Sequence, residues 1–141
     1  MKVLIASDHA GYELKEQLKE RFGSDYEFED YGTCSTESVD YPDFAHKLAA
    51  QVASTPNQYG VLICGTGNGM AMTANKHADV RAGLCWSKEI AALIRQHNNA
   101  NILVMPARFI PAETAFEIFS TFFSTEFEGG RHQRRIDKIN L

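Results

Sequence analysis

The chain has 141 residues, of which 14 are Lys or Arg and 18 are Asp or Glu, so its formal charge is −4. With 44% hydrophobic and 11% aromatic residues, it has the composition of one ordinary, mildly acidic globular domain. No apolar run approaches the roughly 18–20 residues that span a bilayer, which excludes a membrane-spanning helix and a membrane partner. The amino terminus reaches Asp8 too early for a secretory leader, so we expect a first strand and a cytoplasmic protein.

The first half of the chain alternates short apolar runs with amphipathic stretches. Residues 3–6 predict a strand, and residues 11–22 carry apolar side chains at helical spacing. A second strand is expected over residues 26–31, and a helix from residue 41 to about residue 52. Residues 61–64 form a fully apolar strand of the kind that parallel sheets bury. A glycine-rich turn, residues 65–69, and a helix to about residue 76 follow it.

The second half continues the same alternation. Strands are expected over residues 80–85 and 101–105, and helices over residues 87–96, 111–123 and 131–140. Strands that alternate with helices predict βαβ units, and therefore a five-stranded parallel sheet in a three-layer α/β/α, Rossmann-like fold with an extra C-terminal helix. We expect a single domain over residues 1–141. The extended stretch 124–130 projects the last helix away from the sheet, and we expect that helix to pack on another subunit.

Three loops are candidates for a binding site. In open parallel sheets, ligands bind beyond the carboxyl ends of the strands, where loops lead into helix amino termini. This rule selects residues 7–11 after the first strand, 64–69 after the third and 105–108 after the fifth.

The loop after the third strand combines a cysteine with three glycines. Gly65, Gly67 and Gly69 remove side chains from a helix-initiating turn, so several backbone N–H groups can converge on an anion or a developing oxyanion. The spacing matches neither the dinucleotide nor the P-loop pattern, and a tight turn without a ligand is the alternative. Cys64 stands just before this helix amino terminus, a position that favours a thiolate base or nucleophile. A packed, inert thiol is the other interpretation.

The other cysteines and histidines give weaker signals. Cys34 and Cys85 are interpreted as packing or surface residues, and the odd number and wide spacing of the three cysteines predict neither a disulfide framework nor a zinc site. His97 closes a helix, where its cationic form is favoured, although taken by itself this position is better interpreted as a simple helix cap followed by a turn. His46, His77 and His132 have no carboxylate or thiol partners at metal-binding spacing, so we predict no metal site.

The last helix is basic. Arg131 and Arg135 are four residues apart on one face, so their guanidinium groups can bind one phosphate together, and Arg134 and Lys138 form the next pair. A solvated basic face is the alternative. The net charge of −4 and the lack of a second basic stripe argue against nucleic acid as the partner. A small phosphorylated ligand fits a local pair of arginines better.

Taken together, the motifs resemble those of the type B ribose-5-phosphate isomerases, a family that also includes galactose-6-phosphate isomerase subunits. The matching segments occur in order along the whole chain: Ser7-Asp8-His9-Ala10-Gly11, Asp40-Tyr41-Pro42, Cys64-Gly65-Thr66-Gly67, Ala74-Asn75-Lys76, Arg95-Gln96-His97-Asn98 and Gly129-Gly130-Arg131-His132-Gln133. The resemblance implies isomerisation of ribose 5-phosphate to ribulose 5-phosphate, in the pentose phosphate pathway, through an enediolate and without a cofactor.

The resemblance also implies a role for each matched residue. Cys64 corresponds to the base that moves a proton between C1 and C2, Thr66 to a hydroxyl that exchanges protons with the substrate oxygens, and His97 to the acid/base that opens the furanose ring. The expected substrate contacts are Asp8, Tyr41 and Asn98 for the sugar, His9, Arg108, Arg131 and Arg135 for the phosphate, and the loop Gly65, Gly67, Asn68 and Gly69 for the oxyanion. His97, Asn98 and Arg108 are expected from the partner chain of a homodimer, which can pair further into a tetramer.

Two positions distinguish this chain within the family. One branch uses a Glu shortly after the glycine loop, where this chain has Met70, so Cys64 is the base that the resemblance supports. Asn68 stands where many cysteine-type members carry an apolar residue, which leaves a six-carbon substrate such as allose 6-phosphate open. A non-catalytic phosphometabolite-binding module and a thiol redox sensor built on Cys64 are the alternatives from other classes.

Overall fold

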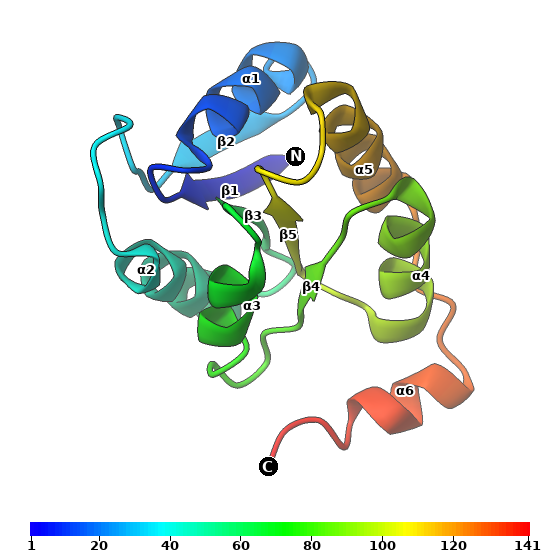
Figure 1. The fold of residues 1–141 in the computed structure, drawn as a ribbon. Coiled ribbons are helices and arrows are strands. Elements are labelled where there is room, and N and C mark those ends of the chain that lie inside the picture. The colour runs from blue at the N-terminus through cyan, green and yellow to red at the C-terminus, as the bar shows by residue number, and fades with distance from the viewer.

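A computed structural model describes residues 1–141, and strands and helices alternate along it (Figure 1). The strands are β1 (Lys2–Ser7), β2 (Glu27–Asp30), β3 (Tyr59–Cys64), β4 (Ala82–Leu84) and β5 (Ile102–Pro106). The helices are α1 (Tyr12–Phe22), α2 (Tyr41–Ser54), α3 (Asn68–Ala74), α4 (Lys88–Asn98), α5 (Ala112–Ser124) and α6 (Arg131–Ile136). None of these helices combines the length and the apolar character that a membrane crossing requires.

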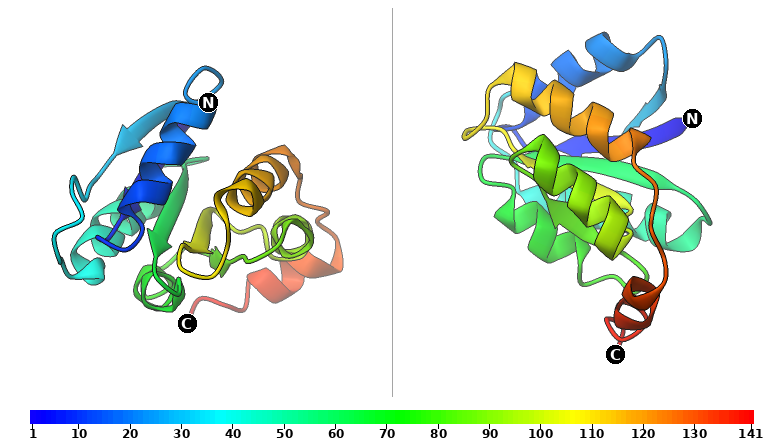
Figure 2. Two further views of the ribbon diagram at one scale, coloured as in Figure 1. Left: turned by 45° about the horizontal axis from the view of Figure 1, so that its top comes forward. Right: turned by 90° about the vertical axis from the view of Figure 1, so that its right-hand side faces the viewer.

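The strands form a single parallel sheet in the order β2-β1-β3-β5-β4. Helices α2 and α3 cover one face, and α1, α4 and α5 cover the other (Figures 1 and 2). The predicted three-layer, Rossmann-like fold is therefore confirmed. Because β1, β3 and β5 are neighbours in the middle of the sheet, the loops that follow them must meet at one edge.

Alternation along the central strands builds two separate cores. In β1, Val3 and Ile5 face the α1/α4/α5 layer, whereas Leu4 and Ala6 face the α2/α3 layer. The same alternation in β3 directs Cys64 toward the α2/α3 layer, and all of these side chains are 5% exposed or less. Strands that are buried on both faces have continuous apolar sequences, which is why these strands could be predicted from the sequence.

Two predicted elements are shorter than expected. The fourth strand, predicted over residues 80–85, is only Ala82–Leu84, because the backbone N–H of Arg81 bonds instead to the side chain of Asn101, at 2.8 Å. The last helix, predicted to residue 140, ends at Ile136. No residue of α6 is buried, and the Asn140 amide leaves the helix path to donate to Asp79 Oδ1 at 2.8 Å. A helix of this length without a buried face has little to extend it.

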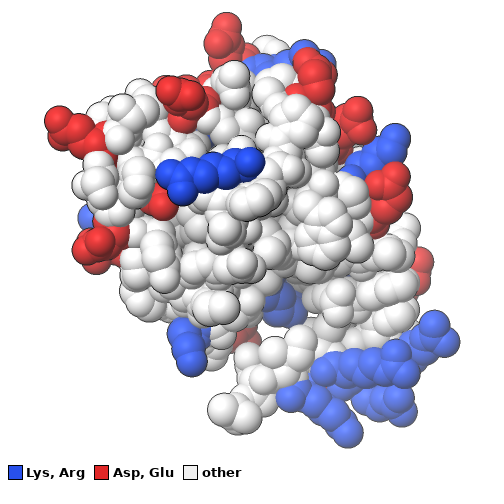
Figure 3. Space-filling view, in the orientation of Figure 1, with Lys and Arg blue, Asp and Glu red and all other residues white.

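Helix α6 stands apart from the sheet, as predicted. The extended stretch after α5 carries it to the end of α4, where the N–H of Glu128 donates to the carbonyl oxygen of Gln96 at 3.1 Å. Both views in Figure 2 show α6 at the periphery of the molecule. Figure 3 shows that Lys and Arg side chains gather over this helix. The basic side chains there are Arg131, Arg134, Arg135 and Lys138.

Candidate active site

The three loops selected from the sequence lie side by side. We call the end of the sheet where the strands finish the carboxyl edge, and the opposite end the amino edge. At the carboxyl edge, Asp8 N–H donates to the Ile63 carbonyl oxygen at 3.2 Å, and Ala107 N–H donates to that of Cys64 at 2.9 Å. The strand register also pairs Cys64 with Pro106. The loops after β1, β3 and β5 therefore form one continuous surface.

Cys64 is the last residue of β3 and is only 5% exposed. It immediately precedes the glycine loop and the amino terminus of α3, on the face of the sheet that α2 and α3 cover. The three cysteines are free thiols. Burial in the opposite core raises the pKa of Cys85 to about 12, which leaves that thiol protonated and inert. Cys64 is thus the buried thiol that adjoins the loops.

The glycines of the loop allow neighbouring groups to approach the backbone closely. Gly67 has φ +78°, and a Cβ atom there would overlap the Leu84 side chain. A Cβ atom on Gly65 would lie 3.3 Å from Nη1 of Arg108, and one on Gly69 would overlap the ring of Tyr41. The absence of side chains at Gly65 and Gly69 therefore lets Arg108 and Tyr41 pack directly against the turn that begins α3.

Two polar residues of the loop are open to solvent. Thr66 and Asn68 are both exposed, and the Thr66 hydroxyl accepts a 3.2 Å hydrogen bond from the Asn68 N–H. The hydroxyl proton of Thr66 is not engaged by this bond and can be donated elsewhere. The exposed side of the turn therefore offers a hydroxyl and a carboxamide to a ligand at this edge of the sheet.

The loop after β1 holds Asp8 and His9 in defined orientations. One carboxylate oxygen of Asp8, Oδ1, accepts from the N–H groups of Ala10 and Gly11 at 2.9 and 3.1 Å. Nδ1 of His9 accepts from the Val39 N–H at 3.2 Å, so a neutral ring carries its proton on Nε2. Both side chains are therefore fixed by backbone groups. The carboxyl-edge group comprises Asp8, His9, Tyr41, Cys64, Gly65, Thr66, Gly67, Asn68, Gly69 and Arg108.

The remaining predicted residues lie elsewhere. Helix α4 follows β4 and leads into β5, so it runs back against the strand direction and ends at the amino edge. His97 and Asn98 are its last residues, and α6 packs beside them. His97, Asn98 and Arg135 line a common cavity of about 350 Å³. We call His97, Asn98, Arg131 and Arg135 the amino-edge group.

The expected division of residues between two chains is corrected at one point. Arg108 was expected to accompany His97 and Asn98, but its side chain lies over Gly65 of its own chain, within the carboxyl-edge group. The physical reason is the neighbouring position of β3 and β5, which brings the start of the loop after β5 onto Cys64 and Gly65. Arg131 and Arg135 instead belong to the helix beside His97.

His97 has two neighbours that the sequence analysis did not identify. Its ring stacks on that of His132, with centroids 4.4 Å apart and planes 13° apart. Glu128 Oε1 lies 3.9 Å from Nε2 of His97 and 3.6 Å from Nε2 of His132. The prediction that His132 lacks a carboxylate partner at metal-binding spacing is therefore wrong. Glu128 precedes α6, so helical spacing gave no signal for this contact.

The electrostatics of this cluster favour neutral imidazole at His132. Burial lowers the pKa of His132, and the nearby His97 and Arg131 lower it further. The alternative interpretation of residues 97–99 as a helix cap also has support, because Asn99 caps α4 with φ +48° and its N–H bonds to the carbonyl oxygens of Ile94 and Arg95. A capping role for Asn99 leaves the side chains of His97 and Asn98 available.

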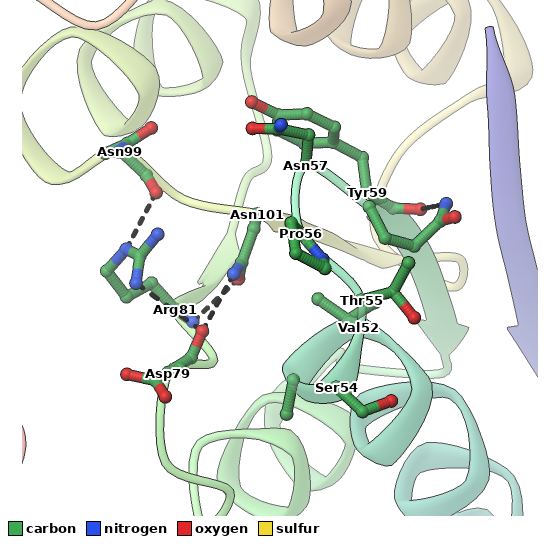
Figure 4. Close-up of a pocket in the computed structure, with 12 residues that line it drawn as sticks. Val52, Ser54, Thr55, Pro56, Asn57, Tyr59, Asp79, Arg81, Asn99 and Asn101 are labelled. Atoms are coloured by element: carbon green, nitrogen blue, oxygen red, sulfur yellow. Dashed lines mark hydrogen bonds between the residues drawn. The ribbon is translucent and has the colours of Figure 1, made fainter.

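Another cavity at the amino edge, of about 300 Å³, has polar walls that bond to one another (Figure 4). Arg81 Nε donates to the Asn99 carbonyl oxygen at 2.8 Å, and Asn101 Nδ2 donates to that of Asp79 at 2.9 Å. These bonds join the loops that precede β4 and β5. We interpret this cavity as part of the structural support at that end of the sheet and assign no chemistry to it.

Comparison with known proteins identifies the family. The family model for ribose/galactose isomerases matches residues 3–139, which is nearly the whole chain. The chain belongs to the ribose/galactose isomerase family. The family resemblance inferred from the motifs is thereby confirmed. Ribose-5-phosphate isomerase B of Escherichia coli is 39% identical over 139 residues, covering 98% of this chain and 93% of that protein.

Solved structures of the ribose/galactose isomerase family have the same fold. A ribose 5-phosphate isomerase from Thermotoga maritima is 54% identical, with a TM-score of 0.95 over 99% of this chain and 97% of that one. Ribose-5-phosphate isomerase B from Mycoplasma genitalium, solved with bound ribulose-5-phosphate, is 44% identical, with a TM-score of 0.94 over 98% of this chain and 93% of that one.

Proposed function

We propose that the protein is an aldose–ketose isomerase that interconverts D-ribose 5-phosphate and D-ribulose 5-phosphate, a reaction of the pentose phosphate pathway. The observation that carries this proposal is the position of Cys64, a buried thiol at the end of β3, directly before a three-glycine turn that opens onto the loops of β1 and β5. The Mycoplasma genitalium relative, which has ribulose-5-phosphate bound, supports the substrate class.

The proton transfer is assigned to Cys64. In the open-chain aldose, the proton on C2 is acidified by the C1 carbonyl, and a thiolate can remove it to give an enediolate and a neutral thiol. Return of the same proton from the thiol to C1 gives the ketose and regenerates the thiolate. A base that is 5% exposed is shielded from water, which limits loss of the proton to solvent during this transfer.

The negative charge of the enediolate is assigned to the glycine loop. The N–H groups at the start of α3 carry no intrahelical partner, and the absence of side chains at Gly65, Gly67 and Gly69 lets a substrate oxygen approach them. To the exposed hydroxyl of Thr66 we assign the movement of a proton between the oxygens on C1 and C2. Base and oxyanion donors are thus adjacent residues of one turn.

Ring opening and phosphate binding involve the second group. We assign to His97 the transfer of a proton from the anomeric hydroxyl to the ring oxygen of the furanose, and to Asn98 a hydrogen bond with a sugar hydroxyl. Arg131 and Arg135 contribute charge for the phosphate, together with His9 and Arg108 at the other edge. Asp8 and Tyr41 line the sugar. No step in this scheme requires a metal or an organic cofactor.

We further propose a homodimer with shared sites. The carboxyl-edge group and the amino-edge group lie at opposite ends of the same sheet, so one chain cannot bring His97 to Cys64. A second copy that presents its α4/α6 end to the glycine loop supplies the missing residues. The separate position of α6 is consistent with this role, because none of its residues is buried within its own chain. Free thiols throughout the chain are consistent with the reducing conditions of the cytoplasm.

Turnover of two sugar phosphates tests the proposed reaction. Ketose formation is measured from ribose 5-phosphate and, in parallel, from allose 6-phosphate, without added metal or nucleotide. The exposed Asn68 in the loop motivates the six-carbon comparison, because its carboxamide can accept a longer polar chain. We expect the higher kcat/KM with ribose 5-phosphate. Folded protein that converts neither sugar, or that binds a nucleotide tightly in calorimetry, would contradict the isomerase and favour the binding module.

A further inference from the structure

Three potential metal ligands converge beside α6. They are His97 at the end of α4, Glu128 in the segment after α5, and His132 in α6. One ligand atom from each residue lies within 4.8 Å of the others. Residues from three consecutive parts of the chain therefore meet at one point of the surface.

The donor set has a recognisable chemical preference. Two imidazoles and one carboxylate are ligands that suit Zn²⁺ and similar divalent transition metals, and three protein ligands leave a coordination position open. Metal–ligand distances of about 2.0–2.2 Å require the ligand atoms to approach one another to roughly 3–3.5 Å. The Glu128 oxygen is already 3.6 Å from Nε2 of His132 and 3.9 Å from that of His97.

The movement that a metal requires is small and involves the exposed side chains. The two rings are stacked nearly parallel, so a shared ion needs one of them to rotate about its Cβ–Cγ bond. The His97 side chain is 41% exposed and that of Glu128 51% exposed, whereas that of His132 is only 11% exposed. His132 can therefore act as the fixed ligand while the other two adjust.

We propose that His97, Glu128 and His132 form a binding site for a divalent transition-metal ion such as Zn²⁺, and that its occupation inhibits the enzyme. The site itself stands on the geometry of the three residues, and the inhibition rests on the proposed function of His97. A metal ion uses the imidazole lone pair that proton transfer to or from the sugar requires, so the bound form cannot open the ring. An isomerase that needs no metal is thereby made sensitive to one.

A second pair of histidines provides a matched control. His46 and His77 lie with Nδ1 and Nε2 only 2.8 Å apart, but no carboxylate joins them in a three-ligand cluster. Zinc binding is measured by calorimetry on the full-length protein with Cys34→Ser and Cys64→Ala, which removes thiols that would compete for the metal. In this background Glu128→Gln, His132→Gln and His77→Gln are compared.

We expect one zinc ion per chain in the background protein and in His77→Gln, and affinity lower by at least about tenfold in Glu128→Gln and His132→Gln. Equal affinity in all four proteins, loss only in His77→Gln, or no binding would overturn the site. Inhibition is measured separately with all cysteines present. Zinc at concentrations that saturate the site should abolish turnover and EDTA should restore it, and binding without inhibition would refute the regulatory role while leaving the proposed isomerase intact.

Discussion

The ammonium group of Lys15 donates to both carboxylate oxygens of Asp30, at 2.6 and 2.8 Å, although the Lys15 side chain is only 1% exposed. The same nitrogen donates to the Thr33 carbonyl oxygen at 2.7 Å. Thr33 N–H in turn donates to the carbonyl oxygen of Ser7, the residue before Asp8. This buried ion pair therefore fixes the loop after β2 against the carboxyl end of β1, where the candidate site begins.

Asp30→Asn is expected to destabilise the protein by about 2–3 kcal/mol, because it leaves the buried Lys15 ammonium only the longer, 3.5 Å contact with the more exposed Glu16 carboxylate. For a chain of this size the melting temperature should fall by roughly 5–10 °C. Glu29→Gln is the control, since Glu29 pairs with Lys2 at 2.7 Å but both side chains are more than 40% exposed. An exposed pair contributes about 0–1 kcal/mol. Equal melting temperatures for the two variants would contradict the importance of burial.

The same pair predicts how stability depends on pH. Burial alone would raise the pKa of Asp30, but hydrogen bonds from Lys15, Lys19 and the Gly32 N–H outweigh it and hold the pKa below the ordinary value of 3.8. A carboxyl group whose pKa is lowered by folding stabilises the native state above its unfolded pKa, and this contribution disappears as the pH falls through the folded pKa.

The wild-type protein should therefore lose stability faster than Asp30→Asn when the pH is lowered from about 5 to about 2. Thermal unfolding of both proteins across this range gives the difference between their melting temperatures. The other carboxylates are common to both proteins, so their contributions cancel in this difference. The two melting curves should converge at the acid end. A difference that stays constant with pH would show that the Asp30 carboxylate does not contribute through its charge.

Cys64→Ala should lower turnover by about 10²–10⁴, the range expected for loss of a general base, without changing the circular dichroism spectrum. Cys34→Ser is the matched control, because Cys34 is an exposed thiol in the loop after β2. It should retain wild-type turnover. Near-normal turnover of Cys64→Ala would remove Cys64 from the mechanism.

Gly67→Ala should impair both stability and catalysis. An alanine at φ +78° costs about 1–2 kcal/mol in backbone strain, and its methyl group would also displace Leu84. Displacement of the oxyanion loop by even 1 Å can lower kcat/KM by about 10²-fold. Gly129→Ala separates the two effects in thermal unfolding, because Gly129 has φ +72° with nothing within 4 Å. If Gly67→Ala lowers the melting temperature no more than Gly129→Ala, the close contact with Leu84 is unimportant.

Local sequence patterns predicted the parts of the fold whose causes are local. The strand that ends at Cys64 and the glycine turn after it were recognisable because burial on both faces and a helix start leave a contiguous signature. The end of α6 could not be predicted in this way, because the helix has no buried face and the chain beyond it is held by a hydrogen bond between Asn140 and Asp79, 61 residues apart. Strand β4 begins later than predicted for a similar reason, since the Asn101 side chain accepts a hydrogen bond from the Arg81 N–H.

The candidate site was predicted residue by residue but not in its arrangement. Its residue types followed from motifs, whereas their grouping depends on strand order. The order β2-β1-β3-β5-β4 places β5, rather than β4, beside β3, and this seats Arg108 on Gly65. The neighbours of His97 depend on the path of the chain after α5, which no periodic pattern describes. Glu128 and His132 were therefore missed as its partners.

The measurement that tests the central claim most directly is complementation between two inactive variants. Cys64→Ala and His97→Ala are coexpressed with different affinity tags, and the mixed dimers are purified and assayed for ketose formation from ribose 5-phosphate. Each mixed dimer contains one site with both residues and one site with neither, so about half of the wild-type turnover per dimer is expected. Mixed dimers no more active than either parent would contradict a site in which Cys64 of one chain and His97 of the other act together.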